Sequence, residues 1–289
     1  MTTTLPMQPT QPTPPTDIRP AQEVRLPGVG RLTLKRGAME LKGFFRTKSQ
    51  FIVIFSLPAI MLMLLGAMSG SRQGLPGITG AQILTAGMIG AGIMGTSFQN
   101  LGINITLERH DGTLKRLYGM PMPRTAYFGG KIIQVLVCMV AEVILLIAVG
   151  VLMFGVKLPT TVTQWLTFTW VLILGGMACT FLGIAIGSLP KSTRGANAVI
   201  TLPFLIVQFC SGVYIPFSDV PWFLQIFASI FPLKWMTQGM RSVFLPEQAV
   251  VLEPAGSWEL PMVALALGLW CVVGLVLCLR TFRWTARDS

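Results

Sequence analysis

Few residues in the sequence have the type and spacing that catalysis requires. The single histidine, His110, rules out sites built from several histidines and gives a Ser–His relay almost nothing to draw on. The one Gly–Lys pair, Gly130–Lys131, is followed by Ile132 and lacks the glycine that opens a phosphate-binding loop. The five cysteines lie inside apolar runs, which is typical of small buried residues. We therefore predict a chain that is not an enzyme and holds no metal and no cofactor of its own.

Glu142 is the one acidic residue well inside a long apolar run. A charged group at the centre of a bilayer costs at least about 2.5 kcal/mol on insertion scales, so a functional role is the default hypothesis. Three interpretations stay open: a protonated side chain, a hydrogen bond to Thr or Ser of a neighbouring helix, and a place in an ion-coupled transport path. A lone acid without a basic partner makes a poor proton relay.

A dense group of charged residues follows the second long apolar run, within residues 108–124. Residues 104–118 could continue the preceding helix, because three leucines would form an apolar edge with charges around it. A short amphipathic helix of this kind can bind in the groove of a soluble partner. It can also rest on lipid headgroups as a positive anchor.

The elements that position these residues must be mostly apolar. Apolar residues make up 52% of the 289 positions and charged residues only 11%, with a mean hydropathy of +0.67. Soluble domains carry about 25% charged residues, so this composition excludes a soluble globular enzyme. The net charge of +11 by itself could indicate nucleic acid. The basic residues cluster beside the apolar runs, however, so we predict a lipid bilayer as the partner and no nucleic acid.

Six apolar runs approach the roughly 20 residues needed to cross a hydrocarbon core about 30 Å thick. They lie near residues 51–70, 81–103, 131–154, 165–188, 198–215 and 260–280. Before the last run, residues 220–231 are apolar but too short to span, and together with residues 233–245 they predict a re-entrant or extracellular helical hairpin. The predicted fold class is an all-α membrane protein with six transmembrane helices.

The segment before the first run has two parts. Residues 1–30 are rich in Thr, Gln and Pro and predict a disordered tail. Residues 31–48 have apolar residues at helical spacing and basic residues on the other faces, which predicts an amphipathic helix on the anionic membrane surface. The apolar positions are Leu34, Ala38, Leu41 and Phe45. The alternative is an ordinary solvated helix packed on a soluble domain.

The distribution of charge predicts the orientation of the chain in the membrane, and the spacing of small residues predicts close helix packing. With these spans, 18 of the 22 Lys and Arg residues fall on the side that holds both termini, and the positive-inside rule makes that side cytoplasmic. Small residues repeat every four positions, which permits close helix contact within the chain or in a dimer. They are Gly87, Ala91 and Gly95 in the second run and Gly183 and Gly187 in the fourth.

One segment carries a resemblance to a known family. The residues Glu108-Arg109-x-x-Gly112-Thr113-Leu114-Lys115-Arg116-Leu117, followed by Pro123-Arg124, resemble the cytoplasmic loop of type-2 ABC-transporter permeases. The nearest likeness is to bacterial drug-resistance exporters of the daunorubicin type. Met122-Pro123 stands where such loops usually have Thr-Pro. The order of the amphipathic helix, six spans and hairpin extends the resemblance over residues 31–289, with 104–130 as the coupling loop.

The resemblance implies a permease subunit in the bacterial plasma membrane that exports hydrophobic or amphiphilic drugs or lipids, as in antibiotic resistance. A dimer with itself or a related permease would dock on two copies of a separate ATP-binding subunit, which holds the ATP and Mg. The docking residues carried over are Glu108, Arg109, Gly112, Leu114, Lys115, Arg116 and Leu117. Closure of the ATPase would push on this loop and tilt spans one, two and five.

The family places the substrate path between spans two and five. Side chains there that are polar or aromatic are expected to face protein or a cavity. The candidates are Phe98, Asn100, Asn104, Phe204 and Gln208. Two other functions stay open: export of a polysaccharide or lipid-linked glycan by the same family, and ion-coupled secondary transport that uses Glu142.

Overall fold

The computed structural model describes residues 28–69, 78–120, 123–190 and 192–282, and over these residues the chain is helical. Almost all of the predicted tail therefore lies outside the described residues. The helices are α1 (Val29–Arg46), α2 (Lys48–Met68), α3 (Gly80–Met94), α4 (Leu101–His110), α5 (Thr113–Tyr118), α6 (Arg124–Phe154), α7 (Val162–Gly187), α8 (Thr193–Cys210), α9 (Trp222–Ser229), α10 (Pro232–Phe244) and α11 (Leu260–Thr281). A π-helical turn, η1 (Gly95–Asn100), joins α3 to α4, and two short 3₁₀ turns, η2 (Phe217–Asp219) and η3 (Glu247–Leu252), flank α9 and α10.

Four of the described helices are long and apolar enough to cross a membrane. They are the continuous helix Gly80–His110, which combines α3, η1 and α4, together with α6, α7 and α11. Two shorter apolar helices, Ile52–Met68 within α2 and Gly195–Cys210 within α8, occupy the first and fifth predicted runs. The all-α class and a multi-pass membrane protein are thereby confirmed. The count of six spans stays a prediction.

Local sequence explains where several helices begin. The Thr79 hydroxyl accepts a hydrogen bond from the Gln82 amide, and the Gln82 side chain accepts one from the Thr79 amide. Thr161 and Gln164 form the same reciprocal pair at the start of α7. Such pairs satisfy backbone donors that the first helical turn leaves free. Pro232 stands in the first turn of α10, where its missing amide hydrogen costs nothing.

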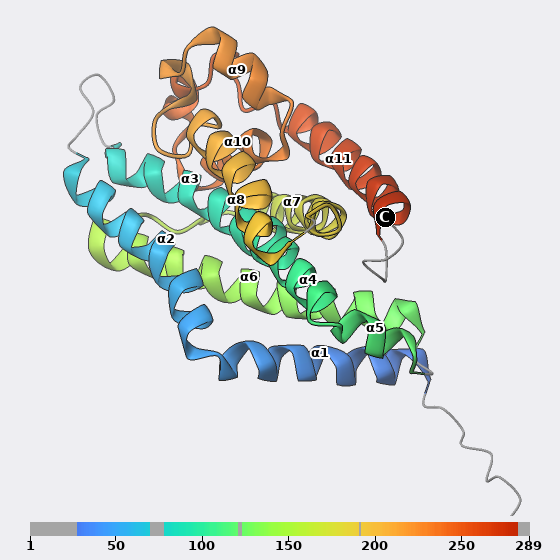
Figure 1. The fold of residues 1–289 in the computed structure, drawn as a ribbon. Coiled ribbons are helices and arrows are strands. Elements are labelled where there is room, and N and C mark those ends of the chain that lie inside the picture. The colour runs from blue at the N-terminus through green and yellow to red at the C-terminus, as the bar shows by residue number, and fades with distance from the viewer. Residues whose placement is uncertain (1–27, 70–77, 121–122, 191, 283–289) are drawn as a thin grey trace, which may run out of the picture.

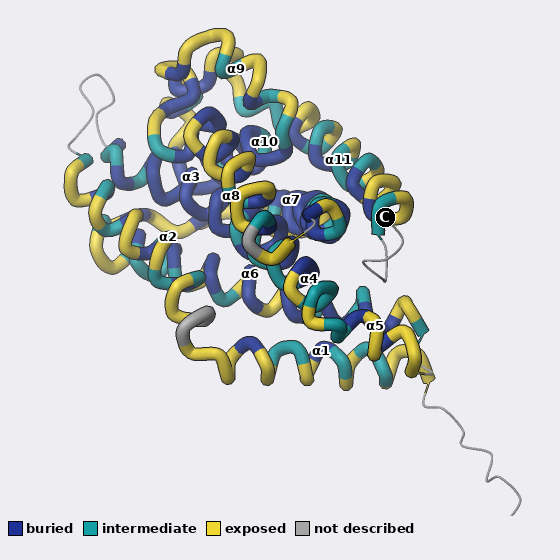
Figure 2. The backbone as a smooth tube through the Cα atoms, viewed as in Figure 1, coloured by how far each residue is buried: buried dark blue, intermediate teal, exposed yellow. Residues whose placement is uncertain are grey.

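The helices form a bundle with different structures at its two ends (Figure 1). α1 runs along one end beside α6, and α5 lies near its beginning. α9 and α10 lie at the opposite end. α3 is buried at the centre, because α2, α6, α7 and α10 all pack against it (Figure 2). The outward faces of α2, α8 and α11 carry exposed apolar side chains, as helices in contact with lipid require.

The segment predicted as a hairpin contains two helices with opposite surroundings. α9 exposes large apolar residues, with Trp222 73% exposed. α10 is buried against α3, α7 and α11, and its predicted apolar stripe contributes Met236, Met240 and Phe244 to the main core. Trp235 of the same stripe is half-buried, and its indole donates a hydrogen bond to the Ser229 carbonyl. A re-entrant or extracellular placement of this pair stays a prediction.

A buried ion pair fixes α10 to the loops around it. Arg241 Nη1 lies 2.8 Å from Glu253 Oε1, and both side chains are about 1% exposed. Arg241 Nη2 also donates to the Gly212 carbonyl at 2.9 Å. One guanidinium thus joins α10 to the segment after α8 and to the segment after η3. Arg241 is one of the four cations that the charge count places on the side opposite the termini, but the structure places its side chain in the interior.

The repeated small residues make contacts inside this chain. A Cβ on Gly183 would lie 2.7 Å from the Ser97 carbonyl oxygen, and one on Gly187 would lie 2.8 Å from that of Gly102. At this close approach of the two helices, the Thr106 hydroxyl donates a hydrogen bond of 2.8 Å to the Gly187 carbonyl. α7 therefore packs backbone to backbone on η1 and α4.

This contact predicts a strong response to a small change. Gly183→Ala is expected to lower the free energy of unfolding by about 1–3 kcal/mol, because backbone atoms must move to admit the methyl group. Gly268→Ala in α11 is the matched control, since no atom lies within 4 Å of a Cβ there. The control should be neutral or slightly stabilising. Thermal unfolding of the purified variants measures both, and equal midpoints would contradict the contact.

Candidate functional site

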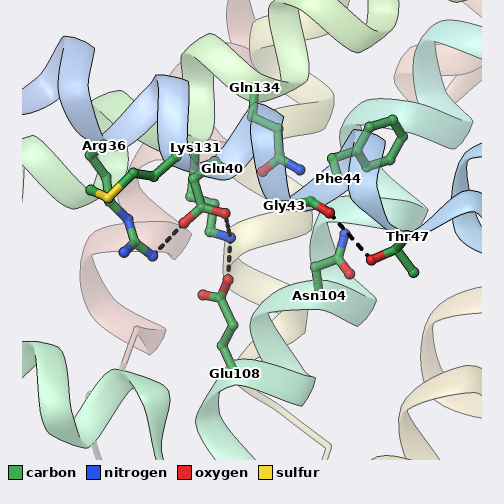
Figure 3. A pocket seen from close by; sticks show the side chains of 10 residues that line it. Arg36, Glu40, Gly43, Phe44, Thr47, Asn104, Glu108, Lys131 and Gln134 are labelled. Carbon is green, nitrogen blue, oxygen red and sulfur yellow. Dashed lines mark hydrogen bonds and ion pairs between the residues drawn. The ribbon is translucent and has the colours of Figure 1, made fainter.

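Three helices meet in a network of charged side chains at the α1 end of the bundle (Figure 3). Lys131 of α6 lies at its centre and is 1% exposed. Its Nζ is 2.8 Å from Glu40 Oε2 of α1 and also forms an ion pair with Glu108 of α4. Arg36 of α1 forms a further ion pair with Glu40. Two positive and two negative groups thus compensate one another, which a buried cluster of charges requires.

Tyr127 completes the network one turn before Lys131 in α6. Its hydroxyl donates a hydrogen bond to Glu108 Oε2 at 2.9 Å. The Arg36 guanidinium lies over the Tyr127 ring, 5.7 Å from the centroid, at a distance where a cation and a ring attract each other. Both oxygens of Glu108 are therefore held by α6, and α6 is held by α1. Arg36, Glu40, Glu108, Tyr127 and Lys131 together form the charged network.

α1 turns part of its predicted apolar stripe away from the bundle. Its apolar positions Leu34 and Phe45 are 66% and 48% exposed, whereas Leu41 is half-buried beside the buried Phe44. A helix packed on a soluble domain would bury that stripe. An exposed apolar stripe on a helix with basic residues beside it is what an interfacial helix presents to lipid.

The predicted docking loop is mostly helical. The second apolar helix continues to His110, a turn follows in which Gly112 has a φ of +73°, and α5 begins at Thr113. A positive φ of this size favours glycine over residues with a Cβ. The described part of residues 104–130 thus comprises most of α4, a tight turn, α5 and the beginning of α6.

The seven predicted docking residues separate into three groups. Leu114 and Leu117 are buried and pack with Tyr127, Phe128 and Phe282. Arg109 donates to the Ser188 and Pro190 carbonyls after α7, and Glu108 belongs to the charged network. Lys115 and Arg116 are exposed and Gly112 is half-exposed, so these are the members that a partner could reach. The assignment of all seven to a docking surface stays a prediction.

Two cavities lie near the predicted substrate path. The smaller has a volume of about 270 Å³ and lies beside the charged network, with Asn104 and Gln134 in its wall (Figure 3). The larger, of about 430 Å³, lies among α2, α3, η1, α6 and α8. Asn100, Phe204 and Gln208 line the larger cavity. Of the remaining candidates, Asn104 lines the smaller cavity and Phe98 packs in the core.

Glu142 faces the π-helical turn. The Thr96 hydroxyl donates a hydrogen bond to Glu142 Oε2, which joins η1 to α6. A hydrogen bond to Thr of a neighbouring helix was one of the three interpretations of this acid, and it is present. Glu142 also lines the larger cavity. Among the described residues, no group of three His, Cys, Asp or Glu side chains is arranged to hold a metal ion.

Sequence reasoning missed most of the charged network. It counted Lys131 and Arg36 only as positive charges and gave Glu40 and Tyr127 no role. One signal was present: Glu40 is the only acid in α1 and stands four residues after Arg36, the spacing of a helical ion pair. Nothing in the sequence pairs Glu40 with Lys131, because 91 positions separate them.

Comparisons with known proteins agree with this architecture. Residues 37–245 match the family model described as ABC-2 type transporter. The chain is also 20% identical over 166 residues to the "Probable multidrug ABC transporter permease YbhR" of Escherichia coli K12, and equally to the protein of that name in strain O157:H7. The match covers 57% of this chain and 44% of each relative, so the chain spans less than half the length of these relatives.

Proposed function

This chain belongs to the ABC-2 type transporter family, and from that membership we propose that it is the permease subunit of an ATP-driven exporter. A separate ATP-binding subunit supplies the energy, and two copies of it act on two permease chains, identical or related. The cargo is a hydrophobic or amphiphilic molecule, a drug or a lipid. Its exit is from the cytoplasm or the inner leaflet of a bacterial plasma membrane, with both termini of the chain on the cytoplasmic side.

The charged network is the observation that supports this function. It ties the amphipathic helix, the end of α4 and the beginning of α6 into one unit at a single end of the bundle. A load applied to α5 at Lys115 and Arg116 passes through α4 to η1 and the larger cavity. The same load passes through Lys131 to α1. Two-state movement of such a rigid unit is an ordinary way to convert a partner's closure into access to a cavity.

The lining of the larger cavity supports the class of cargo. Most of its wall consists of apolar side chains from α2, α3 and α8, such as Leu57, Met61 and Met88. Ligand sites for small organic molecules are largely apolar with a few placed polar groups, and this cavity has Gln99, Asn100 and Gln208. Methionine adapts to ligands of different shape.

Co-purification tests the proposal. The tagged chain from native membranes is expected to bring down a P-loop ATPase, and the chain alone should hydrolyse no ATP. Lys115→Glu with Arg116→Glu should weaken the complex by about tenfold or more, because like charges across an interface repel. Lys157→Glu, an exposed cation between α6 and α7, is the control and should leave the complex intact. A native complex without any ATPase contradicts the proposal.

A further inference from the structure

The larger cavity has an unequal distribution of charge. Its wall contains one carboxylate, Glu142, and the amide side chains of Gln99, Asn100 and Gln208. None of the described residues that line it is Lys, Arg or His. The remaining wall is almost entirely apolar. A charged acid in such surroundings is costly unless a positive partner accompanies it, and the described wall of this cavity provides none.

One oxygen of Glu142 can still accept a contact from a ligand. Thr96 donates to Oε2, and no described residue donates a hydrogen bond to Oε1. Gly92 lines the same cavity, and a Cβ placed on it would lie 3.0 Å from Oε1. The absence of a side chain at Gly92 therefore keeps this oxygen uncovered by α3.

The π-helical turn brings the polar groups to this place. Such a turn holds one residue more than an α-helical turn, and it changes which side chains share a face. In η1, Thr96 reaches α6 and Glu142, while Gln99 Nε2 donates to Thr201 Oγ1 of α8 at 3.1 Å. η1 is thus hydrogen-bonded to both walls of the cavity, to α6 through Glu142 and to α8 through Thr201. The hydrogen bond from Thr96 holds the Glu142 carboxyl group beside η1.

We propose that the larger cavity binds organic cations with apolar substituents and that Glu142 is their counter-charge. The inference rests on the exporter function and narrows its cargo. A cation meets the carboxylate in surroundings of low dielectric, where the attraction is much stronger than in water. The rings of Phe204 and Tyr214 in the same wall can add cation–π attraction. An anion of the same size meets the carboxylate with no basic side chain to offset the repulsion.

Two ions of nearly equal shape and opposite charge test this selection. Tetraphenylphosphonium and tetraphenylborate are offered separately to the purified full chain in lipid nanodiscs without an ATPase subunit. The saturable part of binding is measured, which excludes simple partition into lipid. The wild type is expected to bind the cation saturably and the anion at least about tenfold more weakly.

Substitutions at one position separate charge from shape. Glu142→Gln keeps the size of the side chain and an oxygen that can accept from Thr96, and it should weaken cation binding by about tenfold. Glu142→Asp keeps the charge and should retain most of the preference. Gly95→Leu should remove the saturable binding of both ions, since a side chain there has open space toward the cavity and only Phe204 at 3.7 Å from its Cβ. Glu247→Gln, an exposed acid outside the cavity, should change nothing.

The possible outcomes decide the inference cleanly. The inference is overturned by any of three results: no saturable cation binding, equal binding of both ions, or an unchanged preference in Glu142→Gln. A cavity filled by a lipid chain or by a second copy of the chain would give the first result. Thermal unfolding of each variant shows that it is folded. If the chain binds the cation but brings down no ATPase, only the exporter function is contradicted. If it brings down an ATPase but does not bind the cation, only the cation site is contradicted.

Discussion

A Lys131→Met variant is expected to lose about 3 kcal/mol of unfolding free energy and, on the proposed exporter function, to lose ATP-driven transport. Lys131 is buried between Glu40 and Glu108, and removing it leaves Glu108 without a cation and Glu40 with Arg36 alone. Breaking a buried ion pair from one side costs about 3–5 kcal/mol, and we take the lower end because both acids keep some contact with water. Denaturant unfolding measures the stability, and cargo-stimulated ATP hydrolysis by the assembled complex measures the coupling.

Two further variants distinguish this network from a general charge effect. Lys42→Met removes an exposed cation of α1 and should change stability by less than about 0.5 kcal/mol. Adding Glu108→Gln to Lys131→Met should restore part of the lost stability, because the stranded charge is gone. Transport should stay low in the double variant, since α4 and α6 are no longer joined through Lys131. A Lys131→Met protein with normal stability and transport would refute the role of the charged network.

Arg241→Met is expected to have the largest effect on stability alone, about 3–5 kcal/mol. The guanidinium is buried, and its loss leaves the Glu253 carboxylate and the Gly212 carbonyl without their donor. Replacing both members of the pair, as in Arg241→Met with Glu253→Leu, should recover much of the loss, because the cost comes from the stranded charge. Thermal unfolding of the three proteins measures this.

Lys157→Met serves as the surface control for that series. Lys157 is an exposed cation outside the interior pair, and its removal should leave the midpoint nearly unchanged. Equal stability of Arg241→Met and Arg241→Met with Glu253→Leu would contradict the argument from stranded charge. A loss confined to the double variant would contradict it as well.

Hydropathy and local spacing were enough to predict the helices that carry the fold. α6 and α11 appear as long apolar runs, and the continuation of the second run to His110 follows from the leucine edge beyond residue 104. The extra turn residue in η1 has no counterpart in hydropathy, since a π turn and an α turn have the same composition. α9 and α10 could be located but not distinguished, because burial against α3 is decided by tertiary packing.

The site was less accessible from sequence for a related reason. Glu108 was singled out, but as a residue for a partner, whereas in the structure Lys131 and Tyr127 hold it. The contacts that decide this join segments 23 and 91 positions apart. Periodicity reports which residues share a face of one helix, and it carries no information about which helix that face meets. Arg241 illustrates the same limit, since its partner Glu253 belongs to another segment.

The outward apolar stripe of α1 has a consequence for how this helix can travel. If α1 lies on the membrane surface as predicted, it can shift within the plane of the bilayer without bringing Leu34 or Phe45 into water. Displacement along the membrane normal would expose that stripe at about 25 cal/mol per Å². On the proposed membrane-surface placement, the bilayer therefore resists lifting of α1, and a push delivered through Lys131 moves α1, α4 and α6 together within the plane of the membrane.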